Sequence, residues 1–357
     1  GFGGSGGCND WGGPVEQGGV KSAVEWAAAQ PWSTGKVGLF GKSYDGWTGL
    51  MGIAQHPKGL AAVLSMEPVY SGYRYLYSDG VRFVNSVSTP ALFQAYDVTS
   101  SSVNDTPQYQ VSAAPEAYCY APNYAQQAGL DDPTTAFWKA RDLLPSANKA
   151  TTPLFLTQGF LEDNTKPDGA FTYFRDYAGP KHAWFGQHEH VRGYDATNGV
   201  RANGRTQFIA EANRFLDHWL KGAAATGDPT VEVQDGDGHW RGEKAWPPAD
   251  SKGLRTNLAT GGFADDGNNN GSGGGTEGEG IWSISQPLRR TAHYAGEAVV
   301  RATVNAPAPR ANLVANTYDI APDGGAVLLG RAATLLRGTG VQTATLTLYG
   351  QDWVMPA

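Results

Sequence analysis

The stretch KVGLFGKSYDGW, residues 36–47, contains a serine in a context that favours nucleophilic chemistry. Ser43 follows the short apolar run VGLF and precedes a segment that reads as a helix. A serine on a sharp turn between a strand and a helix is exposed for attack on a carbonyl carbon when small residues flank it. Gly41 lies two residues before Ser43, whereas Gly46 lies three residues after it instead of the usual two. The alternative interpretation is a serine that only caps the helix.

A serine hydroxyl is a poor nucleophile, so it needs a histidine that takes its proton and an acid that orients the histidine. In α/β-hydrolases the acid and then the histidine follow the serine along the chain, each after a strand. The segment after the strand-like run TPLFLT offers Glu162, Asp163 and Asp168 as the acid. Each of these carboxylates could instead be a solvated loop residue or a helix cap.

The segment after the strand-like run HAWF supplies two candidate bases, His188 and His190. Histidines two residues apart could also bind a metal, but no third ligand stands at a recognisable spacing. The other histidines, His182 among them, read as surface or packing residues. The glycines of GFGGSG match a dinucleotide-binding motif by spacing alone, because no strand precedes them and no helix follows. We therefore expect no metal and no cofactor.

The first two thirds of the chain alternate between helix-like and strand-like segments, which predicts α/β architecture with a parallel sheet. An insertion at residues 71–150 interrupts this alternation, and an insertion of that length is usually functional, often a lid or a pocket wall. The strand-like runs are residues 37–40, 60–65, 152–157 and 182–185, and the helix-like segments are residues 15–30, 44–56, 133–144 and 206–222.

Beyond residue 228 the sequence changes to short β-type segments separated by Gly, Pro and Asn turns. That composition predicts an all-β domain, either a sandwich or a jelly roll. We therefore expect two domains, an α/β domain at residues 1–228 and a β domain at residues 229–357. The acidic segment DGDGH at residues 235–239 lacks the late glutamate of a calcium loop and reads as a β-turn.

The composition excludes several classes of protein. A formal net charge of −7 without any Lys/Arg-rich run argues against nucleic-acid binding. No run of about 18 apolar residues is present, so we expect no membrane span. Cys8 and Cys119 could be two unrelated thiols or one disulfide, and a disulfide would fit an exported protein. The glycine at residue 1 leads us to expect that upstream residues are absent.

Four segments together resemble the X-Pro dipeptidyl-peptidase and cocaine esterase-like (CocE/NonD) serine hydrolases. They are GFGGSGG, VEWAAAQPWSTGKVGLFGKSYDG, GFLEDNTKP and GQHEHVRG. The form G-x-S-Y-x-G, with a tyrosine directly after the serine, is characteristic of that family and accounts for the late glycine. The resemblance implies an α/β-hydrolase core with a helical cap insertion, followed by a C-terminal jelly-roll domain of the galactose-binding-like type.

The resemblance also implies roles for individual residues. Ser43 would be the nucleophile, and His190 would be the base because it ends a G-x-x-x-H segment. Counting three residues from Gly159 places the acid at Glu162, although a shift of one residue would bring in Asp163. The backbone N–H of Tyr44 would contribute to the oxyanion hole. In the family, a second donor is a tyrosine hydroxyl upstream of the Gly-rich segment, before residue 1 of this chain.

The motifs predict a serine hydrolase that acts on a small-molecule ester or a peptide, and the resemblance implies an X-Pro dipeptidyl-peptidase. Glu67, just after the strand-like run LAAVLS, could receive a substrate amine or serve a structural role. An esterase of the cocaine esterase type is the alternative within the same family. In a different class, the chain could bind carbohydrate without catalysis, through Trp240, Trp246, Trp282 and Trp353. We expect a location outside the cell or at the cell envelope, and homo-oligomerisation stays open.

Overall fold

The structure is a computed structural model that describes residues 10–84, 88, 89, 91, 92, 124–225, 227–262 and 280–357. Cys8 and Cys119 lie outside these residues, as do the segment GFGGSGG and most of the Gly-rich loop at 259–280. Among the described residues, no helix combines the length and the apolar character needed to cross a membrane.

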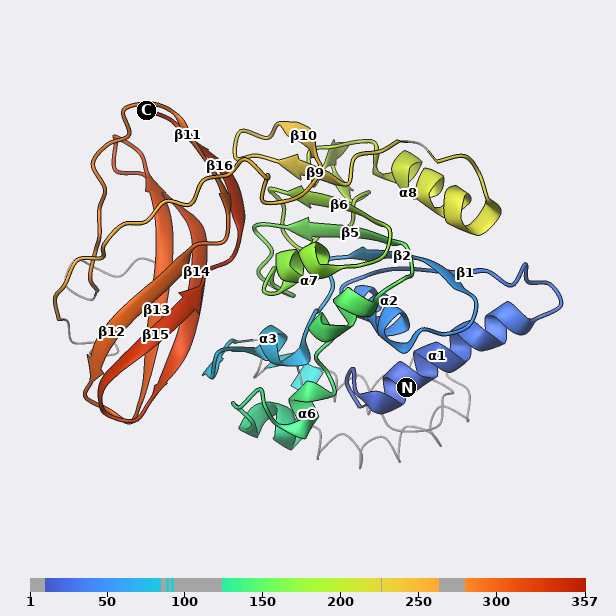
Figure 1. Cartoon of the computed structure of the whole chain (residues 1–357), viewed down its shortest axis with the longest axis horizontal. Coiled ribbons are helices and arrows are strands. Elements are labelled where there is room, and N and C mark those ends of the chain that lie inside the picture. The colour runs from blue at the N-terminus through green and yellow to red at the C-terminus, as the bar shows by residue number, and fades with distance from the viewer. Residues whose placement is uncertain (1–9, 85–87, 90, 93–123, 226, 263–279) are drawn as a thin grey trace.

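A six-stranded sheet forms the centre of the α/β part (Figure 1). Its first five strands are parallel, and the sixth is antiparallel to the fifth, so the sheet is mixed. In spatial order the strands are β1 (Val37–Lys42), β2 (Leu60–Met66), β5 (Leu154–Gly159), β6 (Lys181–Gly186), β9 (Val231–Gln234) and β10 (Trp240–Glu243). The four strand-like runs predicted before residue 228 are β1, β2, β5 and β6.

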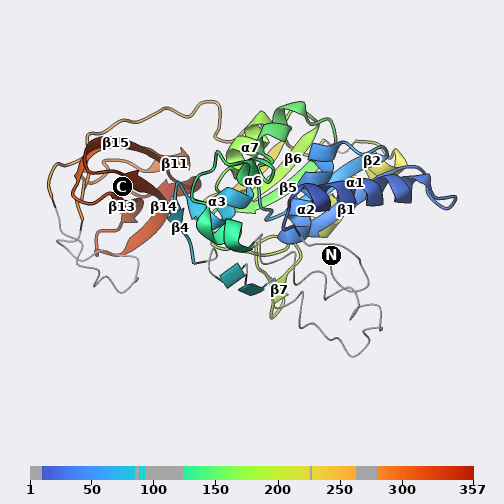
Figure 2. The ribbon, with the colours of Figure 1, turned by 90° about the horizontal axis from the view of Figure 1, so that it is seen from below.

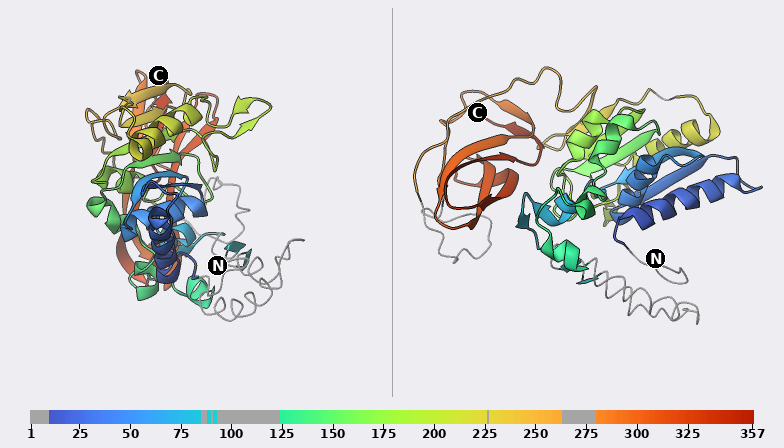
Figure 3. Two further views of the ribbon diagram at one scale, coloured as in Figure 1. Left: turned by 90° about the vertical axis from the view of Figure 1, so that its right-hand side faces the viewer. Right: turned by 60° about the horizontal axis from the view of Figure 1, so that its bottom comes forward.

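Helices cover both faces of this sheet. On one face lie α1 (Pro14–Ala29), α2 (Tyr44–Gln55) and α7 (Ala170–Asp176), and on the other lies α8 (Phe208–Leu216), which one turn of π-helix, η2 (Asp217–Lys221), continues (Figure 3). Gly222 ends this segment in the left-handed region at φ 77°, where glycine has no steric penalty.

Neighbouring residues of the strands divide between the two faces. Val63 packs with the α2 side chains, whereas Leu64 packs against α8. In β6, Ala183 and Phe185 belong to the first core, and Trp184 belongs to the second. Side chains alternate across a strand, so a strand covered on both faces needs a continuous apolar run. This requirement explains why LAAVLS and HAWF read as unbroken apolar segments.

The predicted domain boundary at residue 229 is wrong. Strands β9 and β10 extend the central sheet, because β9 pairs in parallel with β6 and β10 pairs with β9. The turn between them is DGDGH, in which Asp235 accepts hydrogen bonds from the backbone N–H groups of Asp237 and His239. The predicted β-turn is thus confirmed, and the hydrolase sheet continues to Glu243.

The described part of the insertion is irregular. The predicted helix at residues 133–144 shrinks to α6 (Ala136–Lys139). Just beyond this helix, the guanidinium of Arg141 binds the backbone oxygens of Asp10 and Trp11. Figure 2 shows the other short elements, which lie between the central sheet and the C-terminal strands. They are α3 (Gly72–Leu76), β3 (Tyr77–Ser78) and β4 (Val81–Arg82), while η1 (Leu144–Lys149) precedes β5.

Six antiparallel strands form the C-terminal part. They pair as β11 with β16, β12 with β15, and β13 with β14, so along the sequence each pair is nested inside the one before it. Ala306, Leu336 and Leu346 contribute to a small core between the strands. The strands are β11 (Ala292–Gly296), β12 (Val299–Ala306), β13 (Arg310–Ile320), β14 (Ala326–Arg337), β15 (Gly340–Thr347) and β16 (Gln351–Met355).

Candidate active site

The candidate residues gather at one edge of the central sheet, where the parallel strands β1, β2, β5 and β6 end. Ser43 follows β1 and Glu67 follows β2. The acid loop follows β5, and the histidine loop follows β6. Registered pairs join the strand ends: Lys42 with Met66, Met66 with Thr157, and Gly159 with Gly186. In open α/β sheets this edge is the usual place for a binding site.

Ser43 lies in a strained backbone conformation, with φ 64° and ψ −122°. A non-glycine residue rarely adopts positive φ, and such strain concentrates at active sites. The Ser43 N–H donates to the carbonyl oxygen of Met66 at 2.9 Å, which fixes the turn against β2. The Ser43 side chain makes no hydrogen bond that caps α2. The geometry is that of a nucleophile elbow and differs from that of an ordinary helix cap.

The two glycines around Ser43 are required by close backbone contacts. A Cβ atom on Gly41 would lie 2.5–2.6 Å from atoms of Asp45. A Cβ atom on Gly46 would lie 2.8 Å from the carbonyl oxygen of Met66. The late glycine of the motif therefore lets the first turn of α2 pack directly on β2.

Tyr44 occupies the first position of α2. The first N–H groups of a helix have no partner within that helix, so they suit the binding of an anion or oxyanion. The Tyr44 hydroxyl donates to the Glu16 carboxylate of α1 at 2.5 Å, which holds the tyrosine ring inside the protein. The anchored Tyr44 ring therefore helps to fix the position of the Tyr44 backbone N–H at the start of α2.

Glu162 is the carboxylate that contacts His190. Its Oε2 lies 2.6 Å from Nδ1 of His190, and its Oε1 accepts the N–H groups of Asn164 and Thr165 at 2.7 and 3.1 Å. Burial opposes the ionisation of Glu162, but the hydrogen bond with His190 and the two backbone hydrogen bonds hold its pKa below the usual value. An ionised carboxylate is therefore bound to the ring.

The other two candidate acids have different environments. The residue Asp163 is exposed, next to the completely buried side chain of Glu162. Asp168 forms an ion pair with Arg74 of α3. The geometry thus separates the two acids that the sequence left open, with Glu162 on the histidine ring.

The two candidate bases also differ. His188 is 4% exposed, and burial lowers its pKa to about 4, so the ring is neutral. The side chain of His190 is 18% exposed, and its Nδ1 is committed to Glu162. Its Nε2 is therefore the ring nitrogen left for a reacting group. The Nζ of Lys42, the residue before Ser43, donates to the backbone oxygen of His190 at 2.7 Å, which ties the histidine loop to the serine turn.

Glu67 lies behind this site and has no exposed surface. Its Oε2 accepts hydrogen bonds from the Gln158 side chain and the Gly159 N–H, at 2.9 and 3.0 Å. Burial raises the pKa of Glu67 well above its usual range, and the charge of Glu162 raises it further, which favours the protonated form. A carboxyl group without exposed surface favours the structural role, and the amine-binding role has no support in this arrangement.

Lys166 lies in the acid loop, and the sequence did not indicate that its side chain is buried there. It is 1% exposed, and its Nζ donates to the carbonyl oxygens of Tyr75 and Asn164 at 2.9 and 3.0 Å. The ammonium also lies over the rings of Tyr75 and Phe83. Burial lowers the pKa of Lys166 to about 8. A lysine in a polar loop ordinarily points into solvent, so the sequence contained no signal for this contact.

The two histidines of the pair have different partners: Nδ1 of His188 lies 3.4 Å from Oε1 of Glu67, whereas Nδ1 of His190 lies 2.6 Å from Oε2 of Glu162. Within the described ranges, one group of three potential metal ligands does occur elsewhere, at His182, Glu211 and Glu232.

The fold and the elbow define an α/β hydrolase, and comparisons with known proteins agree. The X-Pro dipeptidyl-peptidase (S15) family matches residues 1–192, and the chain belongs to this family. A Streptomyces avermitilis protein named as a candidate Xaa-Pro dipeptidyl-peptidase is 23% identical over 277 residues, which cover 72% of this chain and 38% of that protein. The chain spans about two fifths of the length of such relatives.

Solved structures of hydrolases share the fold. A CocE/NonD family hydrolase from Staphylococcus aureus superposes with a TM-score of 0.71 at 15% identity, over 98% of this chain and 67% of that one. An α-amino acid ester hydrolase gives 0.66 at 16% identity, over 96% of this chain and 71% of that one. The likeness covers the central sheet and the C-terminal strands, so the predicted α/β-hydrolase fold is confirmed, while the jelly-roll topology stays a prediction.

Proposed function

We propose that the chain is the catalytic part of a serine hydrolase with Ser43 as nucleophile, His190 as base and Glu162 as acid. One observation carries this proposal: a buried, ionised Glu162 lies 2.6 Å from Nδ1 of His190, at the sheet edge that also presents the strained elbow of Ser43. Glu162 would keep the proton on Nδ1 and would stabilise the imidazolium that forms during the reaction.

The proposed reaction has two acyl-transfer steps. Nε2 of His190 takes the proton of the Ser43 hydroxyl while the serine oxygen attacks the substrate carbonyl carbon, and the imidazolium then gives that proton to the leaving group. A water molecule, deprotonated by the same nitrogen, hydrolyses the acyl-enzyme and releases Ser43. The N–H of Tyr44 at the start of α2 would bind the oxyanion, and such a donor contributes about 3 kcal/mol to transition-state stabilisation.

For the substrate, we infer an X-Pro dipeptide at the amino terminus of a peptide. Membership of the S15 family supports this inference. An ester is the second candidate, because the carboxyl group predicted to anchor a substrate amine, that of Glu67, has no exposed surface. An ester substrate without an amine needs no such anchor.

A carbohydrate-binding function has little support among the described tryptophans. Trp246 is buried, and the indole N–H of Trp353 donates to Asp319. Trp240 belongs to the central sheet, so the four residues do not share one surface of the C-terminal strands. The nested pairing of those strands supports the jelly-roll prediction. Export from the cell stays a prediction.

Hydrolysis of an Ala-Pro anilide and of a p-nitrophenyl ester, compared in wild type and Ser43→Ala, tests the proposal. We expect the variant to lose at least about 10³-fold in kcat on both substrates and to lose labelling by a fluorophosphonate. Full activity of Ser43→Ala would refute the mechanism. Wild-type activity on the ester alone would assign the esterase function.

A further inference from the structure

A histidine and two glutamates converge at the end of β6 that lies away from the active site. His182 is on β6, Glu232 is on β9, and Glu211 is on α8. Nε2 of His182 lies 3.7 Å from Oε2 of Glu211 and 3.7 Å from Oε2 of Glu232. The three ligand atoms all lie within 4.8 Å of one another. None of these residues takes part in the proposed reaction.

The orientation of the His182 ring is fixed by the backbone. Nδ1 lies 2.7 Å from the carbonyl oxygen of Pro229, which can only accept a hydrogen bond, so Nδ1 carries a proton. In the neutral ring the lone pair of Nε2 then faces the two carboxylates. Within the described part of the chain, Nε2 has neither a hydrogen-bond partner nor exposed surface. A distance of 3.7 Å is too long for a hydrogen bond, and a cation between the three atoms would be attracted by all of them.

The spacing suits a small divalent ion. An ion placed equally far from the three atoms would lie about 2.0–2.4 Å from each of them, given separations of 3.7, 3.7 and at most 4.8 Å. Zinc binds histidine nitrogen at about 2.0–2.1 Å and carboxylate oxygen at about 2.0–2.2 Å. Movements of a few tenths of an ångström would therefore complete the coordination.

Both carboxylates also accept hydrogen bonds from other side chains. The indole N–H of Trp184 donates to the same Oε2 atoms of Glu211 and Glu232 that face His182, at 2.8 and 3.1 Å. The guanidinium of Arg205 contacts Oε1 of each glutamate, at 2.5 and 2.7 Å. Such contacts orient the ligands of metal sites. Arg205 balances one of the two carboxylate charges, which leaves one negative charge for a bound ion, and the partly exposed Arg214 lies 3.9 Å from Glu211.

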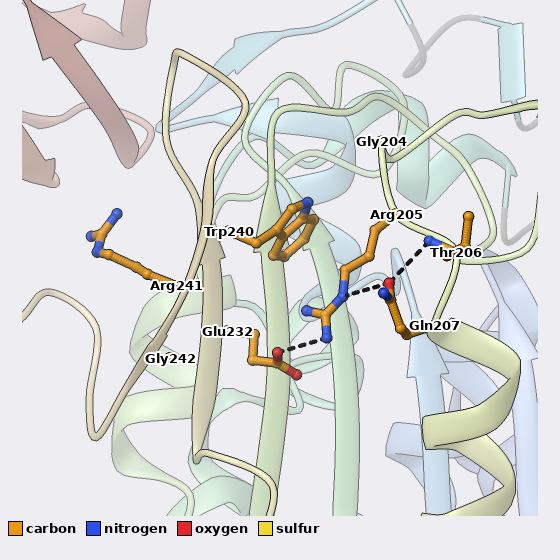
Figure 4. A pocket seen from close by; sticks show the side chains of 8 residues that line it. All are labelled: Gly204, Arg205, Thr206, Gln207, Glu232, Trp240, Arg241 and Gly242. Carbon is orange, nitrogen blue, oxygen red and sulfur yellow. Dashed lines mark hydrogen bonds and ion pairs between the residues drawn. The ribbon is translucent and has the colours of Figure 1, made fainter.

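A cavity of about 410 Å³ lies beside Glu232, whereas His182 and Glu211 do not line it. Arg205, Glu232 and Trp240 line it, and Figure 4 shows the Arg205 guanidinium between Glu232 and Gln207 beside the Trp240 ring.

We propose that His182, Glu211 and Glu232 bind one divalent transition-metal ion, best matched by Zn²⁺. The ion joins α8 to β6 and β9 and so stabilises the side of the sheet opposite to α1 and α2. A proton is the rival occupant: it would convert His182 to an imidazolium. Burial raises the pKa of Glu232, so this carboxyl group could also hold the proton.

Titration of chelator-treated wild-type protein with zinc chloride, followed by calorimetry, decides between the ion and the proton. We expect one equivalent to bind and the melting temperature to rise by a few degrees. His182→Gln and Glu232→Gln should each weaken binding at least about 100-fold and keep ester hydrolysis within twofold of wild type. His218→Gln is the matched control, because Nδ1 of His218 also contacts a carbonyl oxygen, that of Ala223 at 2.6 Å.

Failure of the wild type to bind zinc would overturn the proposal without any variant. Unchanged binding in both His182→Gln and Glu232→Gln would also overturn it. Loss of binding in His190→Gln would place the ion at the active site instead and would overturn it as well. If His182→Gln does not fold, Glu232→Gln and the wild-type titration still decide the question.

Discussion

Replacement of Glu162 by glutamine tests the catalytic arrangement most directly. The amide keeps the size of the carboxyl group, and the side chain has no exposed surface in the folded protein. Glutamine removes the negative charge that lies 2.6 Å from Nδ1 of His190 and offers the ring a weaker acceptor. The chemical step should slow down because the imidazolium formed during proton transfer loses its stabilising partner.

The size of the effect follows from the geometry. Two unit charges centred about 4 Å apart attract each other by about 4 kcal/mol at an effective dielectric constant of about 20. Since each 1.36 kcal/mol changes a rate tenfold, kcat should fall by about 10³. The side chain of His190 is 18% exposed, so solvent screens part of this attraction. A loss of about 10²-fold is therefore the lower limit.

The assay is steady-state hydrolysis of the p-nitrophenyl ester, with the melting temperature as a check on folding. Asp163→Asn is the matched control, because it removes a carboxylate from the neighbouring, exposed residue. We expect this control to keep kcat within about twofold of wild type. The assignment of the acid would be refuted by a large loss in Asp163→Asn combined with a small loss in Glu162→Gln.

Three further predictions concern groups around the site. Glu67→Gln should leave the KM for the Ala-Pro anilide within about threefold of wild type, because the Glu67 carboxyl group is buried and bound to Gln158 and Gly159. Lys166 has a pKa of about 8 in the folded protein and a usual value of 10.5. Above pH 8 the folded protein has lost this proton while the unfolded chain still holds it, so the free energy of unfolding rises with pH. Urea denaturation should show this free energy rising between pH 8 and 10 by about 2 kcal/mol more in the wild type than in Lys166→Met. Gly46→Ala should lower the free energy of unfolding by about 1–3 kcal/mol, since the new methyl group meets a carbonyl oxygen at 2.8 Å.

Each of these predictions has an outcome that would contradict it. A KM for the anilide raised more than tenfold in Glu67→Gln, with ester hydrolysis unchanged, would restore the amine-binding role. If the free energy of unfolding rose more between pH 8 and 10 in Lys166→Met than in the wild type, the prediction for Lys166 would be wrong. Gly19→Ala is the control for Gly46→Ala: nothing lies within 4 Å of a Cβ atom at Gly19, so this substitution should stabilise α1 by up to about 1 kcal/mol.

The sequence predicted the central sheet up to β6 because each buried parallel strand is a short apolar run bounded by turns. The same rule failed at β9, since VEVQ alternates like a strand of a separate β domain. Which sheet such a strand joins depends on contacts with β6 that its own residues do not encode. The helix predicted at 133–144 is also longer than α6 in the structure, which ends at Lys139.

At the site, chain order and motif spacing identified Ser43 and the two loops. They did not separate Glu162 from Asp163, because adjacent residues in a loop can point in opposite directions. The burial of Glu67 and Lys166 was also out of reach, since charged residues at strand ends and in loops are usually solvated. Only the packed structure shows that these two groups sit beneath the acid loop.

The histidine loop is fastened to the last strand of the chain. The Gln187 side chain, three residues before His190, donates to the Gln351 side chain at 2.7 Å and to the carbonyl oxygen of Asp352 at 2.9 Å. These contacts join residues 164 and 165 positions apart in sequence. During synthesis on a ribosome, the loop that carries the catalytic base therefore acquires this support only after the C-terminal strands have emerged. A protease cut that frees the C-terminal strands would remove these two hydrogen bonds from the loop that carries His190.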